Sequence, residues 1–122
     1  MITSFIMVAL GGAIGASARF GLALALARDG FPVAIIAANV LGSFLMGLFF
    51  MWSLQKGMTH LNPLVMTGVL GGFTTFSAFS LEAYTLLERG QAGAAAAYVA
   101  ISVVASLLAL AAGVALARGV LG

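Results

Sequence analysis

The segment Gly71–Ser80 reads GGFTTFSAFS and combines, within ten residues, several side chains that could bind an ion. Phenylalanine recurs at every third position, as Phe73, Phe76 and Phe79, between glycines, threonines and serines. Hydroxyl groups donate hydrogen bonds to anions, and the edge of a phenyl ring carries partial positive charge. Glycine, serine and threonine are also poor formers of an uninterrupted helix. Because non-helical backbone survives at membrane depth only where protein or a water-filled cavity satisfies it, we expect a broken helix at a functional site.

Phe76 and Phe79 lie three residues apart, so their rings share one helix face. We expect the ring edges to solvate a small anion without the full charge that would trap it. The alternative is that the rings simply pack, as most phenylalanine pairs do. An anion-binding role is favoured over simple packing because four hydroxyl residues, which a plain core would not need, flank the rings: Thr74, Thr75, Ser77 and Ser80.

The backbone of the predicted break also suits a cation. Carbonyl groups that are freed where a helix unwinds coordinate cations, whereas the N-terminus of a half-helix favours anions. The residues from Gly71 to Thr75 would supply such carbonyls. Glu82 follows Phe79 by three residues on the same face, and we expect it to be either a pathway carboxylate or the partner of an arginine.

Two polar residues stand inside other apolar stretches. Asn39 shares a helical stripe with Ser43 and Gly47, and its amide could donate hydrogen bonds to an anion or only to a neighbouring helix. Arg19 lies past the middle of the first apolar stretch. A buried arginine marks a functional or partner site by default and favours anions nearby, and the alternative is that its side chain snorkels to the headgroups.

A third set of hydroxyls recurs every four residues near the C-terminus, as Tyr98, Ser102 and Ser106. On a helix these side chains form one stripe, which could line a polar track. The alternative is that the serines bond to carbonyls of their own helix.

The elements that must position these residues are membrane helices. The chain has 122 residues, of which 63% are hydrophobic and only 7% charged, whereas soluble domains contain about 25% charged residues. The opening stretch lacks a basic leader and a convincing cleavage site, so we expect a retained span. We predict one all-α domain over residues 1–122, with both termini on the same side and spans near 4–27, 32–54, 62–86 and 92–117.

The composition excludes several function classes. The chain has no cysteine, a single histidine and three acidic residues, too few for hydrolytic or metal-dependent chemistry. Its net charge of +2 is too small and scattered for a nucleic-acid surface. We therefore expect neither an enzyme nor a nucleic-acid partner.

Basic residues in short loops normally set the orientation of a membrane protein. One side of the predicted bundle carries Lys56 and Arg118, and the opposite side carries Arg28 and Arg89, so the two sides balance. Either the rule is weak in a chain with so few charges, or the protein inserts in both orientations and pairs antiparallel with itself. Four short helices enclose little space, so a transport role favours such a homodimer.

Small residues four apart allow close approach of helix backbones, either between copies or within one chain. Three such pairs are present: Gly11 with Gly15, Gly12 with Ala16, and Gly68 with Gly72.

Three segments together resemble the CrcB/Fluc family of fluoride channels: GGAIGASAR at 11–19, NVLGSFLMG at 39–47 and GGFTTFSAF at 71–79. The resemblance covers the whole chain, with all three motifs in order. It implies a multi-pass protein of the bacterial inner membrane, assembled as a dual-topology antiparallel homodimer. It also implies two narrow pores, each lined by both subunits, that passively export cytoplasmic fluoride.

The resemblance assigns roles to individual residues. Asn39, Phe76 and Phe79 match the pore asparagine and the two phenylalanines whose edges face fluoride. Hydroxyls expected along the pore or its vestibule are those of Ser43, Thr75, Ser77, Ser80, Tyr98, Ser102 and Ser106, with Glu82 near the track. Gly71 and Thr74 match residues whose backbone carbonyls, from both subunits, hold a structural sodium ion on the dimer axis, and Arg19 matches a buried arginine. The chain departs from the pattern at Ala78, where many relatives carry threonine.

Two other functions compete with the channel. A small multidrug-type proton-coupled antiporter would share the size, span number and dual topology. It would need a carboxylate in the first span, where this chain has Arg19, and its only intramembrane acid is Glu82 in the third. The other rival is a non-transporting helical subunit whose polar groups only bind it to a partner.

Overall fold

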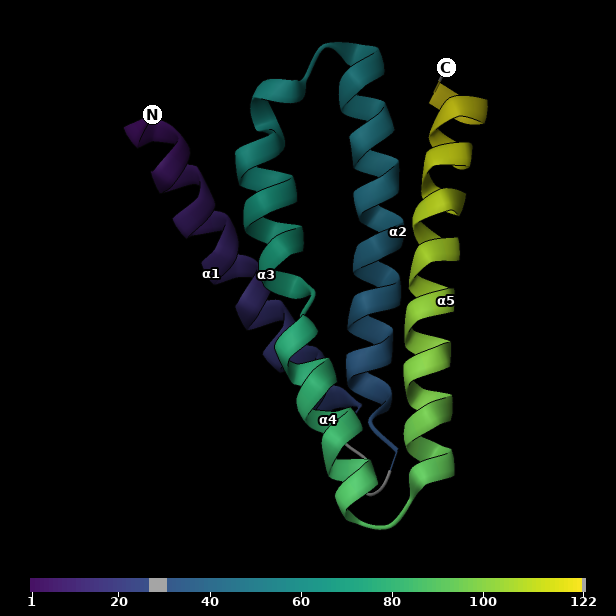
Figure 1. The fold of residues 1–122 in the computed structure, drawn as a ribbon. Helices are drawn as coiled ribbons and strands as arrows, with labels where there is room; N and C mark the ends of the chain where they lie inside the picture. The colour runs from purple at the N-terminus through teal and green to yellow at the C-terminus, as the bar shows by residue number, and fades with distance from the viewer. Residues whose placement is uncertain (27–30, 122) are drawn as a thin grey trace.

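The computed structural model of this chain describes residues 1–26 and 31–121, and every secondary-structure element in that part is a helix. Both termini lie at the same end of the molecule (Figure 1). Residue 27, where the first predicted span ends, and Arg28 of the charge balance lie outside the described residues. The elements in chain order are α1 (Ile2–Ala25), α2 (Val33–Lys56), η1 (Thr59–Leu61), η2 (Pro63–Leu70), α3 (Gly71–Phe73), α4 (Phe76–Glu88), α5 (Ala92–Leu116) and η3 (Ala117–Leu121).

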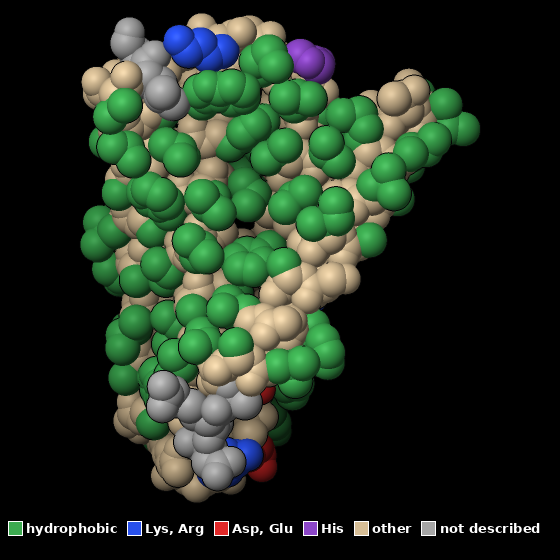
Figure 2. Space-filling view, turned by 180° about the vertical axis from the view of Figure 1, so that it is seen from behind, with side chains coloured by type: hydrophobic (Ala, Val, Ile, Leu, Met, Phe, Trp, Pro, Cys, Tyr) green, Lys and Arg blue, Asp and Glu red, His purple; other side chains and the backbone are tan. Residues whose placement is uncertain are grey.

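Four helical stretches of the described part are long and apolar enough to cross a membrane: Ile2–Ala25, Val33–Lys56, Thr59–Glu88 and Ala92–Val120. Hydrophobic side chains cover the middle of the face in Figure 2, and lysine and arginine lie at its two ends. This distribution matches a bilayer, where apolar surface meets lipid and charged groups stay at the headgroups. The predicted all-helical protein with four spans is confirmed.

The third span is broken, as predicted, but the break is shorter than expected. Gly71 and Gly72 remain helical in α3, and only Thr74 and Thr75 leave the helix, with φ/ψ of −88°/158° and −153°/126°. Helical conformation resumes at Phe76. The chain changes direction at this point, between α3 and α4 (Figure 1).

The two threonines end one helix and start the next. The Thr74 hydroxyl and N–H both donate to the Leu70 carbonyl, at 2.9 and 3.0 Å, which closes the last turn of α3. The Thr75 hydroxyl accepts the Ala78 N–H at 3.1 Å, which makes Thr75 the N-cap of α4. Side-chain capping by threonine, rather than the freedom of glycine, therefore produces the break.

Glycines bring the helices into backbone contact within one chain. A Cβ added at Gly11 or Gly15 would meet backbone atoms of η2 or α3, around Gly68 and Val69. A Cβ at Gly47 would likewise meet the α5 backbone. Two of the small-residue pairs found in the sequence, 11/15 and 68/72, thus serve the packing of α1 on the first half of the third span.

Candidate ion pathway

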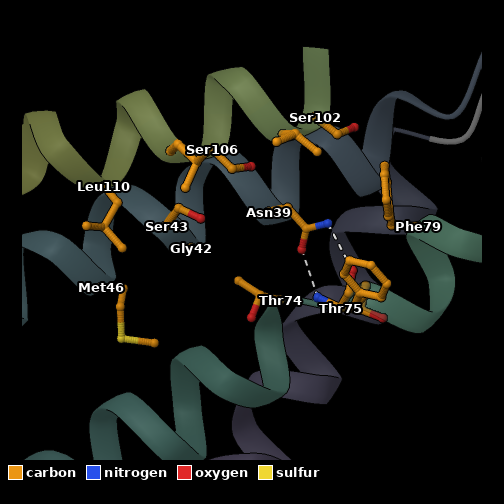
Figure 3. Close-up of a pocket in the computed structure, with 13 residues that line it drawn as sticks. Asn39, Gly42, Ser43, Met46, Thr74, Thr75, Phe79, Ser102, Ser106 and Leu110 are labelled. Atoms are coloured by element: carbon orange, nitrogen blue, oxygen red, sulfur yellow. Dashed lines mark hydrogen bonds between the residues drawn. The ribbon is translucent and has the colours of Figure 1, made fainter. Parts of the chain in front are cut away.

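A cavity of about 390 Å³ lies between α2, the helix break and α5 (Figure 3). Its walls come from three parts of the chain that are distant in sequence. From α2 the lining residues are Asn39, Gly42, Ser43 and Met46; from the break and α4, Thr74, Thr75, Phe76 and Phe79; and from α5, Ser102, Val103, Ser106, Leu107 and Leu110.

Asn39 holds the break in place. Its Oδ1 accepts the Thr75 N–H at 2.7 Å, and its Nδ2 donates to the Thr75 carbonyl at 3.0 Å (Figure 3). The Asn39 Oδ1 thus replaces the helical acceptor that the Thr75 N–H has lost, and the Nδ2 adds a hydrogen bond to the carbonyl of this N-cap residue. The interhelical hydrogen bond considered for this residue is present, and Asn39 lines the cavity as well. Because the amide nitrogen carries two hydrogens, one remains for a ligand.

Both phenylalanine rings reach the cavity from the first turn of α4. Their centroids lie 5.4 Å apart with an interplanar angle of 59°. Phe79 is 9% exposed and stacks on Tyr98 at 5.3 Å, whereas Phe76 is 78% exposed in the single chain. The ring of Phe79 is therefore fixed by contacts within the chain, and the ring of Phe76 presents its surface outward.

The hydroxyl stripe of α5 faces the interior. The hydroxyl oxygens of Tyr98, Ser102 and Ser106 are buried and have no hydrogen-bond partner within residues 1–26 and 31–121. The serines therefore do not bond to their own helix, the alternative considered for them. Ser102 and Ser106 line the cavity from α5, beside Asn39 and Ser43 of α2 (Figure 3). Because a buried polar group without a partner costs about 1–3 kcal/mol, these donors are suited to water or an anion.

Three other predicted residues lie away from the cavity lining, although they share the α4 segment. The Ser77 hydroxyl is 3.3 Å from that of Thr75. Ser80 donates to the Phe76 carbonyl at 2.9 Å on the exposed side of α4, and Glu82 lies farther along the helix. Their roles along a track stay predictions.

Arg19 reaches from α1 to the broken span. Its Nε donates to the Gly72 carbonyl at 3.3 Å, and the side chain is half-buried. The guanidinium thus lies at the C-terminal end of α3, where a helix carries partial negative charge. This contact directs the side chain to the break and not to the headgroups.

Apolar residues of the lining were not predicted as site residues. Gly42 is needed because a Cβ there would collide with the Thr74 methyl group. Met46 and Leu110 close the end of the cavity away from Asn39 (Figure 3). Helical spacing from Asn39 and Ser43 was the available signal for Gly42 and Met46, since they follow by three residues each.

Comparison with known proteins identifies the family. The CrcB-like protein family, also described as Camphor Resistance (CrcB), matches residues 6–114. The chain belongs to the CrcB family. A relative from Ruegeria sp. is 58% identical over 99% of both chains, and one from Roseobacter denitrificans is 59% identical over 96% of this chain and 97% of its own.

CrcB-family relatives also carry a functional name. The proteins from Ruegeria and Roseobacter, and a third from Jannaschia sp. that is 64% identical over 74% of this chain, are each named fluoride-specific ion channel FluC. The CrcB family is thus one of ion channels, and the expectation that the chain is not an enzyme is confirmed.

Proposed function

We propose that this chain forms a passive, fluoride-selective channel that lets fluoride leave the cytoplasm. The observation that carries the proposal is the cavity at the helix break, which is lined by two phenylalanine rings and by two serine hydroxyls that have no hydrogen-bond partner in the described part of the chain. The names of the CrcB-family relatives support fluoride as the ion.

Fluoride holds its hydration shell tightly, so a pathway must replace that shell with other donors. Ser102, Ser106 and the free hydrogen of the Asn39 amide are donors of this kind. The edges of Phe76 and Phe79 add weak positive potential, and the Arg19 charge biases the break toward anions. Several weak sites in series let the ion enter and still leave.

A structural sodium ion fits the backbone at the break. In a continuous helix the Gly71 carbonyl would accept the Thr75 N–H, and the Thr74 carbonyl would accept the Ala78 N–H. Instead, the Asn39 Oδ1 accepts the Thr75 N–H, and the Thr75 hydroxyl accepts the Ala78 N–H. Both carbonyls are therefore released, and carbonyl oxygens suit a hard cation. Two copies related by a two-fold axis would offer four oxygens, so the ion would join two subunits.

Removing sodium tests that assignment. Protein purified and reconstituted with N-methylglucamine as the only cation should lose most of its fluoride flux, because the two breaks would repel each other through their carbonyls. Flux should return when sodium, but not choline, is added back. Equal fluoride flux in carefully sodium-depleted and sodium-containing samples would rule out a structural role for sodium.

We propose an antiparallel homodimer as the conducting unit, with two pores. The ring of Phe76, 78% exposed beside the cavity, supports a wall supplied by a second copy. The balance between Lys56 and Arg118 on one side and Arg28 and Arg89 on the other supports insertion in both orientations.

Because the chain has no cysteine, single cysteines can report orientation. Thr59→Cys and Gln91→Cys change exposed residues at opposite ends of the molecule. In spheroplasts, an impermeant maleimide should label about half of each variant if both orientations are present. Nearly complete labelling of one variant with none of the other would show a single topology.

Fluoride efflux from liposomes containing the pure protein tests the proposed function. A fluoride electrode should record rapid efflux once valinomycin allows potassium to follow, with chloride efflux much slower. A requirement for a proton gradient would instead indicate the antiporter, and absence of any flux would indicate the non-transporting subunit.

A further inference from the structure

Four aromatic rings form a continuous row from the start of α2 to the cavity. The ring of Phe31 meets that of Tyr98 edge to face, with centroids 5.7 Å apart and planes at 88°. Tyr98 lies against Phe79 at 5.3 Å and 31°, and Phe79 lies against Phe76 at 5.4 Å. Only the last two rings are part of the cavity lining.

The inner rings of this row have little freedom. Tyr98 has no exposed surface and Phe79 is 9% exposed, and both belong to the same buried cluster. Phe31 packs against that cluster from outside. Since interiors are close-packed, the plane of Phe79 depends on Tyr98, and the plane of Tyr98 depends on the ring of Phe31 at its other side.

The backbone conformation of Phe31 is itself restricted. The Val33 N–H donates to the Phe31 carbonyl at 2.9 Å across Pro32, whose φ and ψ of −81° and 75° form an inverse γ-turn. A residue before proline is also restricted to extended conformations. The ring of Phe31 is therefore attached to a rigid backbone segment just before α2.

We propose that Phe31 is a positioning residue that sets the orientation of the Phe79 ring through Tyr98, and with it the preference for fluoride over larger anions. The inference rests on the proposed function. Its physical basis is that only a ring edge, and not a face, offers positive potential to an anion, so a tilt of Phe79 weakens the site without removing it.

The test replaces the outer ring and leaves the cavity lining untouched. Phe31→Leu should lower fluoride flux in liposomes about three- to tenfold, the size of one lost aromatic pair, and should lower the fluoride-to-chloride flux ratio. Phe31→Tyr, which keeps the ring, should restore both. Phe20→Leu, on the exposed side of α1, is the matched control and should behave as wild type.

A second readout does not depend on flux. The chain has two tyrosines, so labelling with 3-fluorotyrosine gives two ¹⁹F signals. Phe31→Leu should shift or broaden the signal of buried Tyr98 and leave that of Tyr84, which is 59% exposed, unchanged.

The two readouts separate failure of this inference from failure of the proposed function. If wild-type protein conducted no fluoride, the proposed channel function would be overturned. The ¹⁹F spectrum would still decide whether Phe31 fixes the position of the Tyr98 ring. Conducting Phe31→Leu protein with a wild-type flux ratio and an unchanged Tyr98 signal would overturn the positioning role.

Discussion

Asn39→Leu is expected to abolish conduction, with fluoride flux at least about a hundredfold below wild type. The substitution removes both hydrogen bonds to Thr75 and leaves its N–H unpaired in a partly buried site. An unpaired buried N–H costs about 1–3 kcal/mol, so the break would relax toward a continuous helix and carry the α4 rings with it. The same change removes a donor from the cavity.

Liposome flux with matched variants checks this result. Asn62→Leu is the control, because Asn62 lies at the start of the third span, away from the cavity, and its Oδ1 is unpartnered within the described part of the chain. Asn39→Asp keeps the acceptor for the Thr75 N–H, loses the donor and adds negative charge, so it should also be inactive. Flux of Asn39→Leu within about twofold of wild type would show that the hydrogen bonds from Asn39 to Thr75 are dispensable for conduction.

Phe79→Ile is the second change with a large expected effect, about a hundredfold loss of flux with the assembly intact. Isoleucine fills much of the space beside Tyr98 but has no positive ring edge to offer an anion. The loss of packing should lower stability by only about 1–3 kcal/mol, which a helical membrane protein of this kind should survive.

The control for this substitution is Phe20→Ile, at a ring that is 66% exposed on α1. Size-exclusion chromatography in detergent should give the same elution volume for both variants and wild type. If Phe79→Ile conducts fluoride as fast as Phe20→Ile, the ring edge has no part in conduction.

The segment 71–80 shows what the sequence could predict and what it could not. Clustered glycine and threonine predicted a broken span, and the break is there. Its position at Thr74 and Thr75, after two glycines that stay helical, depends on Asn39, which is 36 residues away from Thr75. A contact of that range leaves no trace in local propensity.

Helical spacing predicted which residues share a face, but not where that face ends. Tyr98, Ser102 and Ser106 form a buried stripe, as their spacing indicated. Ser77 and Ser80 belong to the same motif as the two rings, yet the 100° step of α4 turns them away from the cavity. The glycine pairs likewise indicated close approach of backbones, and only the fold decides that α1 is the partner of the third span.

The zero-current voltage of a planar bilayer containing the pure protein tests the central claim most directly. With a tenfold fluoride gradient, equal pH and an opposing chloride gradient, the voltage should lie near the fluoride equilibrium potential, about 59 mV in magnitude. It should not move when a pH gradient is added. A voltage that follows the chloride or proton gradient would contradict a passive fluoride-selective channel.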